Sequence, residues 1–338
     1  MKKIVDKETN RVAFGSYNEP LELNFDDYRL VSFFGKKYSK NKTLRNLKKF
    51  NYYSFVDHDK VVSIGIVKLG FINNIFAYVH TRKDGIVFDE QINILGTNKV
   101  TYFGDNYNFK VDYVSKKTQI HVNKNRDGLI DININFKNQF KCIAKIQIPK
   151  EYERAIVCNP ADFTKWTFTE KMTGLVTKEH SITLNGKPVF IPNSEIICNS
   201  DWSAGFFKRK TNWIWASCAT KINKDLIGFN LTVFINDAQY PESTVWINNK
   251  KHIISRVIFD ANYLDHNASE IRIYTEDGMI NLNYKIAGAK TDIRNRLNIV
   301  KTNFHQYIGS FNGTIKLNNK VYKIVDALGC FEFNKTVW

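Results

Sequence analysis

The sequence predicts an all-β protein built from antiparallel strands, with two barrel-like units in tandem and little helix. Hydrophobic and polar residues alternate in run after run, turn residues separate the runs, and helical periodicity is nearly absent. The runs follow one another at the spacing of about 8–12 residues that is typical of β-sandwiches and barrels. Phe, Tyr and Ile, which favour strands, are abundant.

The first unit is expected over residues 1–155. Residues 41–50 are basic and fit one short helix, after which the pattern is that of strands. A turn at Lys83-Asp84-Gly85 separates two of them. The strands are expected at residues 60–69, 75–82, 107–113, 117–123, 129–136 and 140–148.

Alternation is clearest at residues 129–136. Ile130, Ile132 and Ile134 fall on one face of the expected strand, and polar residues such as Asp131 fall on the other. This indicates an antiparallel meander with one face exposed to solvent. Pro149 ends the meander, and the boundary between the units is placed at residues 155/156.

The second unit is expected over residues 156–338. Glu276-Asp277-Gly278 is typical of a hairpin turn. Neither a βα alternation nor a glycine-rich phosphate-binding pattern occurs, so no nucleotide cofactor, and no cofactor of another kind, is expected. Its strands are expected at residues 212–219, 227–235, 253–259, 270–275, 280–286, 297–301, 304–308, 314–317 and 321–325.

The formal net charge of +16 has two interpretations. It is typical of proteins that bind nucleic acid or an anionic membrane, and it also follows from a composition rich in Lys, Asn and Ile. The basic residues are spread along the chain, and no zinc-finger or helix-turn-helix signature occurs. We therefore expect no specific nucleic-acid partner and only a weak contact with anionic membrane surfaces.

The cysteines and the hydrophobic runs indicate an intracellular protein. No CxxC pair occurs and the histidines lack ligand spacing, so neither a disulfide framework nor a metal site is expected. No secretory signal pattern and no run of about 18 apolar residues occurs, which favours the cytoplasm. The five cysteines are Cys142, Cys158, Cys198, Cys218 and Cys330.

Residues 201–217 contain three of the six tryptophans. On a strand, Trp213 and Trp215 would share one face, where they would either pack in a barrel core or wall a ligand cavity. Asp201 stands beside Trp202, and an aromatic wall would raise the pKa of that carboxyl by desolvation and make it a general acid. The alternative is a turn carboxylate next to a tryptophan core.

The candidate catalytic residues are Asp201, Glu242 and His305. One of His305 and Gln306 is expected to point inward, because neighbours on a strand face opposite sides. Arg209 would anchor an anionic head group or lie in a solvated Lys-Arg-Lys loop. The candidate ligand-binding residues are Trp202, Arg209, Trp213, Trp215, Asn230, Gln306 and Glu332.

Several motifs of the second half resemble a family of unknown function, domain of unknown function 2804. The family often has Arg at the position of Ala204 and Asn-Glu at the position of Pro241-Glu242, so this chain departs from it twice. The motifs that carry the resemblance are Asp201-Trp202-Ser203-x-Gly205, Thr211-Asn212-Trp213-Ile214-Trp215-Ala216-Ser217, Gly228-Phe229-Asn230-Leu231, residues 304–313 and Gly329-Cys330-Phe331-Glu332.

The chain is similar, more distantly, to lipocalin-like two-barrel proteins that include carotenoid hydratases and cyclases. That similarity implies paired calycin-type barrels and a hydrophobic small-molecule ligand of lipid or isoprenoid type. The leading hypothesis is an intracellular protein that binds such a ligand in a β-barrel cavity, with cofactor-free hydratase, cyclase or isomerase activity. The alternatives are a non-catalytic lipid carrier and a protein that acts on anionic membranes or nucleic acid.

Overall fold

The computed structural model describes residues 1–96, 99–234, 239–254, 256–260, 269–296 and 300–337, and it confirms the all-β class. Within these residues it contains 24 strands, one 3-10 turn, η1 (Phe25–Asp27), and one short α-helix, α1 (Lys40–Leu44). The named strands of this part pair in an antiparallel manner throughout and form three sheets. Their closure into two barrels stays a prediction.

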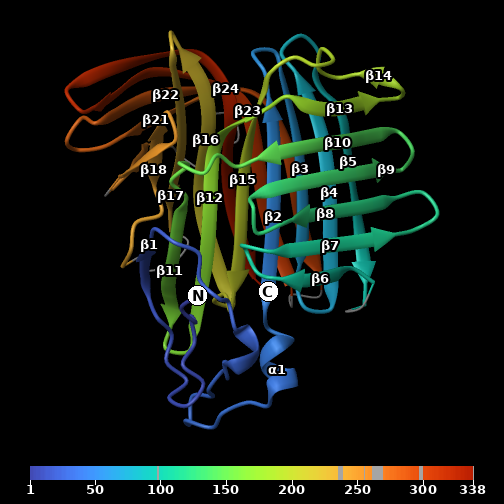
Figure 1. Ribbon diagram of the computed structural model, residues 1–338, viewed down its shortest axis with the longest axis vertical. Coiled ribbons are helices and arrows are strands. Elements are labelled where there is room, and N and C mark those ends of the chain that lie inside the picture. The colour runs from blue at the N-terminus through green and yellow to red at the C-terminus, as the bar shows by residue number, and fades with distance from the viewer. Residues whose placement is uncertain (97–98, 235–238, 255, 261–268, 297–299, 338) are drawn as a thin grey trace.

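The first sheet has eight strands and occupies the middle of the molecule (Figure 1). It joins strands from both sides of residue 155, so the predicted division into two domains does not coincide with a division between sheets and stays a prediction. Its strands, in spatial order, are β1 (Gly15–Tyr17), β11 (Ala155–Asp162), β12 (Lys165–Thr177), β15 (Ile196–Gly205), β2 (Lys48–Val56), β3 (Lys60–Lys68), β4 (Ile72–Thr81) and β5 (Gly85–Leu95).

The second sheet has seven strands, which cross in front of β2–β5 in Figure 1. It contains the predicted meander, and its alternation is confirmed: Ile130, Ile132 and Ile134 are buried, and Asn133 is exposed. Its strands are β14 (Lys187–Pro188), β13 (Glu179–Leu184), β10 (Phe140–Gln147), β9 (Leu129–Phe136), β8 (Gln119–Lys124), β7 (Phe109–Val114) and β6 (Thr101–Gly104).

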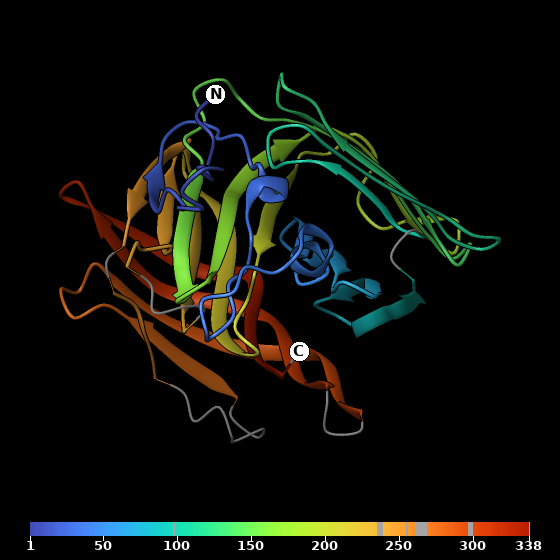
Figure 2. The same ribbon diagram turned by 90° about the horizontal axis from the view of Figure 1, so that it is seen from below.

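The third sheet has nine strands and covers the other face of the first sheet (Figure 2). It comes almost entirely from the last third of the chain. Its strands are β19 (Lys250–Ile253), β18 (Thr244–Ile247), β17 (Asp225–Val233), β16 (Lys210–Ile222), β24 (Lys320–Val337), β23 (Val300–Leu317), β22 (Ile280–Arg296), β21 (Glu270–Tyr274) and β20 (Ile258–Asp260).

Three clusters of buried hydrophobic residues hold the sheets together. The largest lies between the first and second sheets, and another lies within the curved third sheet. A small third cluster, which includes Val61, Tyr78 and Leu328, lies between the first and third sheets. Because it fills only part of that interface, the remainder is available for a cavity.

Several local expectations differ from the structure, and the expected strand at 253–259 is among them, since β19 ends at Ile253 and β20 begins at Ile258. The separate strands expected at residues 304–308 and 314–317 are parts of one long strand, β23, because Phe311 to Gly313 form a bulge that keeps the pairing with β24. Residues 297–299 of the expected strand 297–301, and Ile235 at the end of another, lie outside the described residues. The expected helix at 41–50 is confined to α1, since Lys48 already belongs to β2.

The described part of the chain contains no helix that is long and apolar enough to cross a bilayer. All five cysteines are buried and free.

Burial raises the pKa of every one of these thiols, so we expect them to react slowly in the folded protein. In denaturant without reductant, a colorimetric thiol titration should find five. Recovery of one or three thiols would contradict this.

Candidate functional site

A cavity of about 700 Å³ lies between the first and third sheets. Strands β12, β15 and β2–β5 form one wall, and β16 and β22–β24 form the other. Its volume falls in the range of small-molecule sites, roughly 300–1,000 Å³. Aromatic side chains supply much of the lining: Phe50, Tyr52, Phe76, Phe207, Trp213 and Trp215.

Strand β16 places the two tryptophans of the sequence motif on one face, as their alternation predicted, and both line this cavity. Trp215 is buried at the inner end, where its Nε1 donates to Asn230 Oδ1 at 2.5 Å and its ring meets Tyr52 edge-on. Trp213 is half-buried, and its Nε1 donates to Glu332 Oε1. Trp215 also belongs to the third hydrophobic cluster, so it is both core and cavity wall.

Glu332 is a buried acid of the cavity with a strongly raised pKa. It lies on β24 opposite Trp215 and Gln306, and the Gln306 amide donates to its Oε2 at 2.7 Å. Burial, and to a lesser degree the nearby Asp201 carboxylate, raises the pKa of Glu332 to about 7, although Trp213, Gln306 and Lys171 act in the opposite direction. A carboxyl with such a pKa exchanges its proton near neutral pH, as a general acid or base requires.

Asp201 lies across the sheet from Lys171, and the two form an ion pair of 3.0 Å. Ser203 donates to the other Asp201 oxygen at 2.9 Å, and Thr169 contacts Ser203 at 3.0 Å. Lys171 is almost completely buried, with 3% of its side chain exposed. These residues bring a carboxylate, a cation and two hydroxyls to one wall of the cavity.

Glu242 lies behind Lys171, outside the lining of the cavity. Its Oε2 is 3.9 Å from Lys171 Nζ, and Asn159 donates to its Oε1 at 3.2 Å. Burial raises the pKa of this carboxyl, while Lys171 and Asn159 lower it. Glu242 therefore holds Lys171 in place and does not itself reach a ligand in the cavity.

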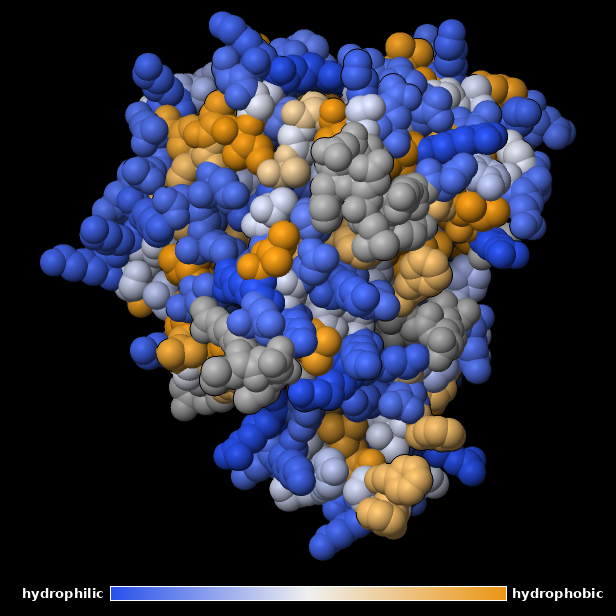
Figure 3. All heavy atoms as spheres, turned by 180° about the vertical axis from the view of Figure 1, so that it is seen from behind, coloured by the Kyte–Doolittle hydropathy of each residue, from blue (hydrophilic) through white to orange (hydrophobic). Residues whose placement is uncertain are grey.

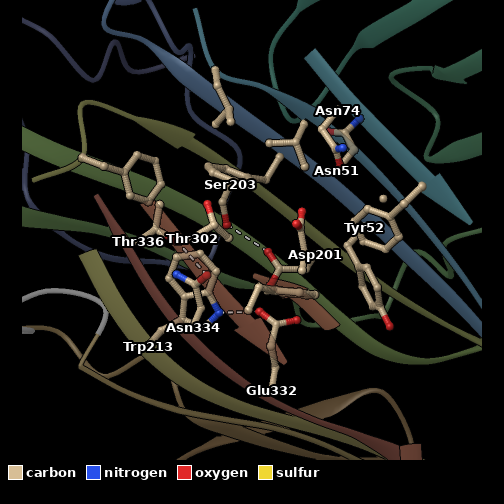
Figure 4. A pocket seen from close by; sticks show the side chains of 18 of the residues that line it. Asn51, Tyr52, Asn74, Asp201, Ser203, Trp213, Thr302, Glu332, Asn334 and Thr336 are labelled. Carbon is tan, nitrogen blue, oxygen red and sulfur yellow. Dashed lines mark hydrogen bonds between the residues drawn. The ribbon is translucent and has the colours of Figure 1, made fainter. Parts of the chain in front are cut away.

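Figure 4 shows how these groups converge. Asp201, Ser203, Trp213 and Glu332 surround one end of the void, although they come from three strands of two different sheets. Leu69, Phe71 and Leu95 line the cavity several residues further along β3–β5, next to Asn93, which accepts a hydrogen bond from Arg294. The cavity thus combines apolar side chains with polar, titratable groups, which suits an amphipathic molecule.

The other predicted site residues lie away from the cavity. Trp202 packs against Phe168 on the opposite face of β15, which corrects the picture of an Asp201 carboxyl against the Trp202 ring. His305 also lies on the far face of its strand, where it contacts Asn303 and stacks on Tyr307. It is Gln306 that points towards Glu332.

Arg209 and Asn230 take other positions. Arg209 is exposed between β15 and β16 and does not line the cavity. Asn230 is buried on β17 and supports the Trp215 indole from behind.

Lys171 is the residue that the sequence reasoning missed. Lys171 lies on β12, where every residue from Trp166 to Leu175 is buried. In the sequence, the only sign of this is a lysine in the middle of a run of strand-favouring residues. Its role becomes visible once β12 is paired with β15, because the pairing sets Lys171 opposite Asp201.

Comparison with solved structures finds matches of low sequence identity. A putative AttH from Nitrosomonas europaea is 9% identical, with a TM-score of 0.49, over 86% of this chain and 92% of that chain. Kievitone hydratase from Nectria haematococca is 10% identical, with a TM-score of 0.44, over 86% and 88%. CghA is 8% identical, with a TM-score of 0.49, over 100% and 96%.

No curated protein matches the sequence. The model of one family, described as domain of unknown function (DUF2804), matches residues 23–338. That match includes every strand of the cavity wall, both tryptophans and Glu332. The chain therefore belongs to the DUF2804 family.

Proposed function

We propose that the protein binds an apolar or amphipathic small molecule, of lipid or isoprenoid type, in the cavity between its first and third sheets. The observation that carries this proposal is the composition of the cavity, in which aromatic and aliphatic side chains accompany a titratable acid. The apolar part of the ligand would lie between Leu69, Phe71 and Leu95. Its polar or unsaturated part would meet Trp213, Asp201 and Glu332.

The same geometry supports a cofactor-free proton transfer. In a hydration, the Glu332 proton would go to one carbon of a conjugated double bond, and a water oxygen would bond to the other carbon. Asp201 would take the proton that this water loses and release it to solvent, and solvent would return a proton to Glu332. Trp213 and Trp215 would stabilise positive charge that develops on the ligand, since aromatic faces attract cations.

A non-catalytic carrier is the second candidate, and one observation favours it. Both carboxyl oxygens of Glu332 already accept hydrogen bonds, from Trp213 and from Gln306. These two hydrogen bonds lower the pKa of Glu332 and so favour its carboxylate form. A carboxylate can hold a polar group of a carried ligand, but it has no proton to give.

Extraction of the purified protein and incubation in D₂O distinguish these functions. A co-purifying apolar molecule identifies the ligand, and proton-initiated chemistry by the wild type should place deuterium on one of its carbons. Glu332→Gln should bind the molecule and incorporate no deuterium. Binding without incorporation by the wild type would favour the carrier, and the absence of any bound apolar molecule would contradict both.

The two tryptophans should respond differently to truncation. Trp215→Ala is expected to cost about 3–5 kcal/mol of unfolding free energy, as large-to-small core substitutions do, because its ring is buried. Trp213→Ala should cost less, because that ring is half-buried, yet it should weaken ligand binding. Urea unfolding and a binding titration check both. Unchanged affinity in Trp213→Ala would remove this indole from the binding site.

A further inference from the structure

The loops at the lower end of the molecule in Figure 1 carry exposed aromatic side chains. Phe33 and Phe34 are 98% and 92% exposed, and Phe163, in the turn between β11 and β12, is also fully exposed. A soluble surface rarely leaves neighbouring phenylalanines in water, because burying each one is favourable. From behind, hydrophobic side chains stand out among hydrophilic ones at this end (Figure 3).

Phe33 and Phe34 are held at the tip of an ordered hairpin. The Ser32 amide donates to the Lys36 carbonyl at 2.8 Å, and the Gly35 amide donates to the Ser32 carbonyl at 2.9 Å. Gly35 adopts a φ of +79°, which favours glycine and closes the turn. The two rings pack edge-on at 5.4 Å. The hydrogen-bonded turn thus holds both phenylalanine side chains in a position that points towards solvent.

The cavity opens at this same end of the molecule, where two apolar residues of its lining reach the surface. Phe71, in the turn between β3 and β4, and Leu95, at the end of β5, both line the cavity and are 62% and 64% exposed. The Gly96 amide ties the two segments together by donating to the Phe71 carbonyl at 2.9 Å. Exposed apolar residues therefore mark the mouth as well as the hairpin. Figure 1 shows that the β3–β4 turn, the end of β5 and the N-terminal loops lie towards the same end of the molecule.

Basic residues accompany these apolar ones. Lys36 and Lys37 follow the two phenylalanines after a single glycine, Gly35. Lys48 and Lys165 lie on strands that border the cavity mouth, and burial, together with the charge of Lys165, lowers the pKa of Lys48 to about 8. Arg209 is exposed in the loop between β15 and β16. Such an arrangement of cations attracts anionic head groups.

We propose that this lower end docks on a lipid bilayer that contains anionic head groups, with Phe33 and Phe34 inserted at the interface and the cavity mouth turned towards the lipid. Entry of the ligand from the bilayer, past Phe71 and Leu95, rests on the proposed function. The docking itself does not.

The form of the surface favours a bilayer over a protein partner. A stable protein interface needs a continuous complementary patch of roughly 800 Å² on each side. Here the apolar side chains project from separate loops, with lysines between them. Separate apolar tips insert into a fluid interface, and the flanking lysines reach the phosphates.

Vesicle flotation tests the docking. The wild-type chain should float with phosphatidylcholine vesicles that contain phosphatidylserine, and much less with phosphatidylcholine alone. Phe33→Ser with Phe34→Ser should weaken this binding by about a hundredfold, since each lost phenylalanine contributes about tenfold or more. Lys36→Glu with Lys37→Glu should reduce binding to the anionic vesicles only, and added salt should do the same.

Two controls make the outcome specific. Ile191→Ser with Val325→Ser removes two exposed apolar residues from other parts of the surface and should leave flotation unchanged. The phenylalanine double variant should keep the wild-type affinity of its cavity for a fluorescent fatty acid.

Failure of the wild type to float with anionic vesicles would overturn the docking proposal, whatever the cavity binds. Equal flotation of the phenylalanine double variant would overturn the assignment of this surface. A wild-type dimer that this variant dissociates would show instead that the hairpin is an interface between copies of the chain. If the wild type floats with anionic vesicles but does not bind the fatty acid, the proposed function is overturned and the docking proposal is not.

Discussion

Replacement of Lys171 by Met is expected to lower the free energy of unfolding by about 3–5 kcal/mol at about pH 8. Lys171 is the buried cation that contacts both Asp201 and Glu242. Its loss leaves the buried Glu242 carboxylate without a counter-ion, and Glu242 Oε2 has no hydrogen-bond donor to compensate. Urea unfolding of the purified variant measures the effect.

The loss of unfolding free energy in Lys171→Met should be larger at high pH than at low pH. Burial already raises the pKa of Glu242, so this carboxyl takes up a proton readily once Lys171 is gone. The destabilisation should therefore be smaller at about pH 5 than at about pH 8. The double variant Lys171→Met with Glu242→Gln should recover part of the loss, because it leaves no buried charge at that position. An equal penalty at both pH values would contradict the ion-pair account.

Glu332→Gln is expected to change how stability depends on pH. The pKa of Glu332 rises from 4.5 in the unfolded chain to about 7 in the fold, so between these values the folded protein binds the proton more tightly. The unfolding free energy of the wild type should therefore fall as pH rises through this window, by on the order of 3 kcal/mol from this group. Glutamine does not titrate, so the variant lacks this loss.

The comparison is made by urea unfolding at a series of pH values. Relative to the wild type, Glu332→Gln should gain stability as pH rises from about 4.5 to about 8, and the difference should level off above the folded pKa. Gln306 Oε1 has no hydrogen-bond partner, so a flipped Gln306 amide can accept from the new side chain. Parallel pH curves for the two proteins would show that the pKa of Glu332 is the same in the folded and the unfolded chain, and would contradict this account.

The alternation of residues along a strand predicted correctly which side chains share a face. The alternation of Trp213 and Trp215 placed both on one face, and the structure puts both in the cavity. The same rule left His305 and Gln306 open, since neighbours on a strand always face opposite sides. The choice depends on which face of β23 packs against the first sheet, and Gln306 points to that side.

The remaining features depend on contacts between distant segments. Lys171 becomes part of the site only through the pairing of β12 with β15, and Asp201 reaches it across that pair. Trp202 lies in the core because one face of β15 packs towards the second sheet. The other face of β15, with Asp201 and Ser203, lines the cavity. Alternation along a strand shows which residues share a face, but it cannot show which of two buried faces lines the cavity. The family motifs pointed to Glu332, but its raised pKa follows from burial that only the assembled sheets create.

The most direct test of the account is whether filling the cavity prevents binding. Val67 lines the cavity and is half-buried, so Val67→Trp adds an indole to the void. Val87 on β5 is exposed and does not line the cavity, so Val87→Trp is the matched control. The ligand is cis-parinaric acid, a conjugated fatty acid whose emission rises when it leaves water.

The account predicts saturable binding of cis-parinaric acid to the delipidated wild type and to Val87→Trp. Val67→Trp should bind at least about tenfold more weakly, with an unfolding free energy close to that of the wild type, because the new ring occupies space that a ligand needs. Equal affinity in all three proteins would place the fatty acid elsewhere and contradict a ligand-binding cavity between the first and third sheets.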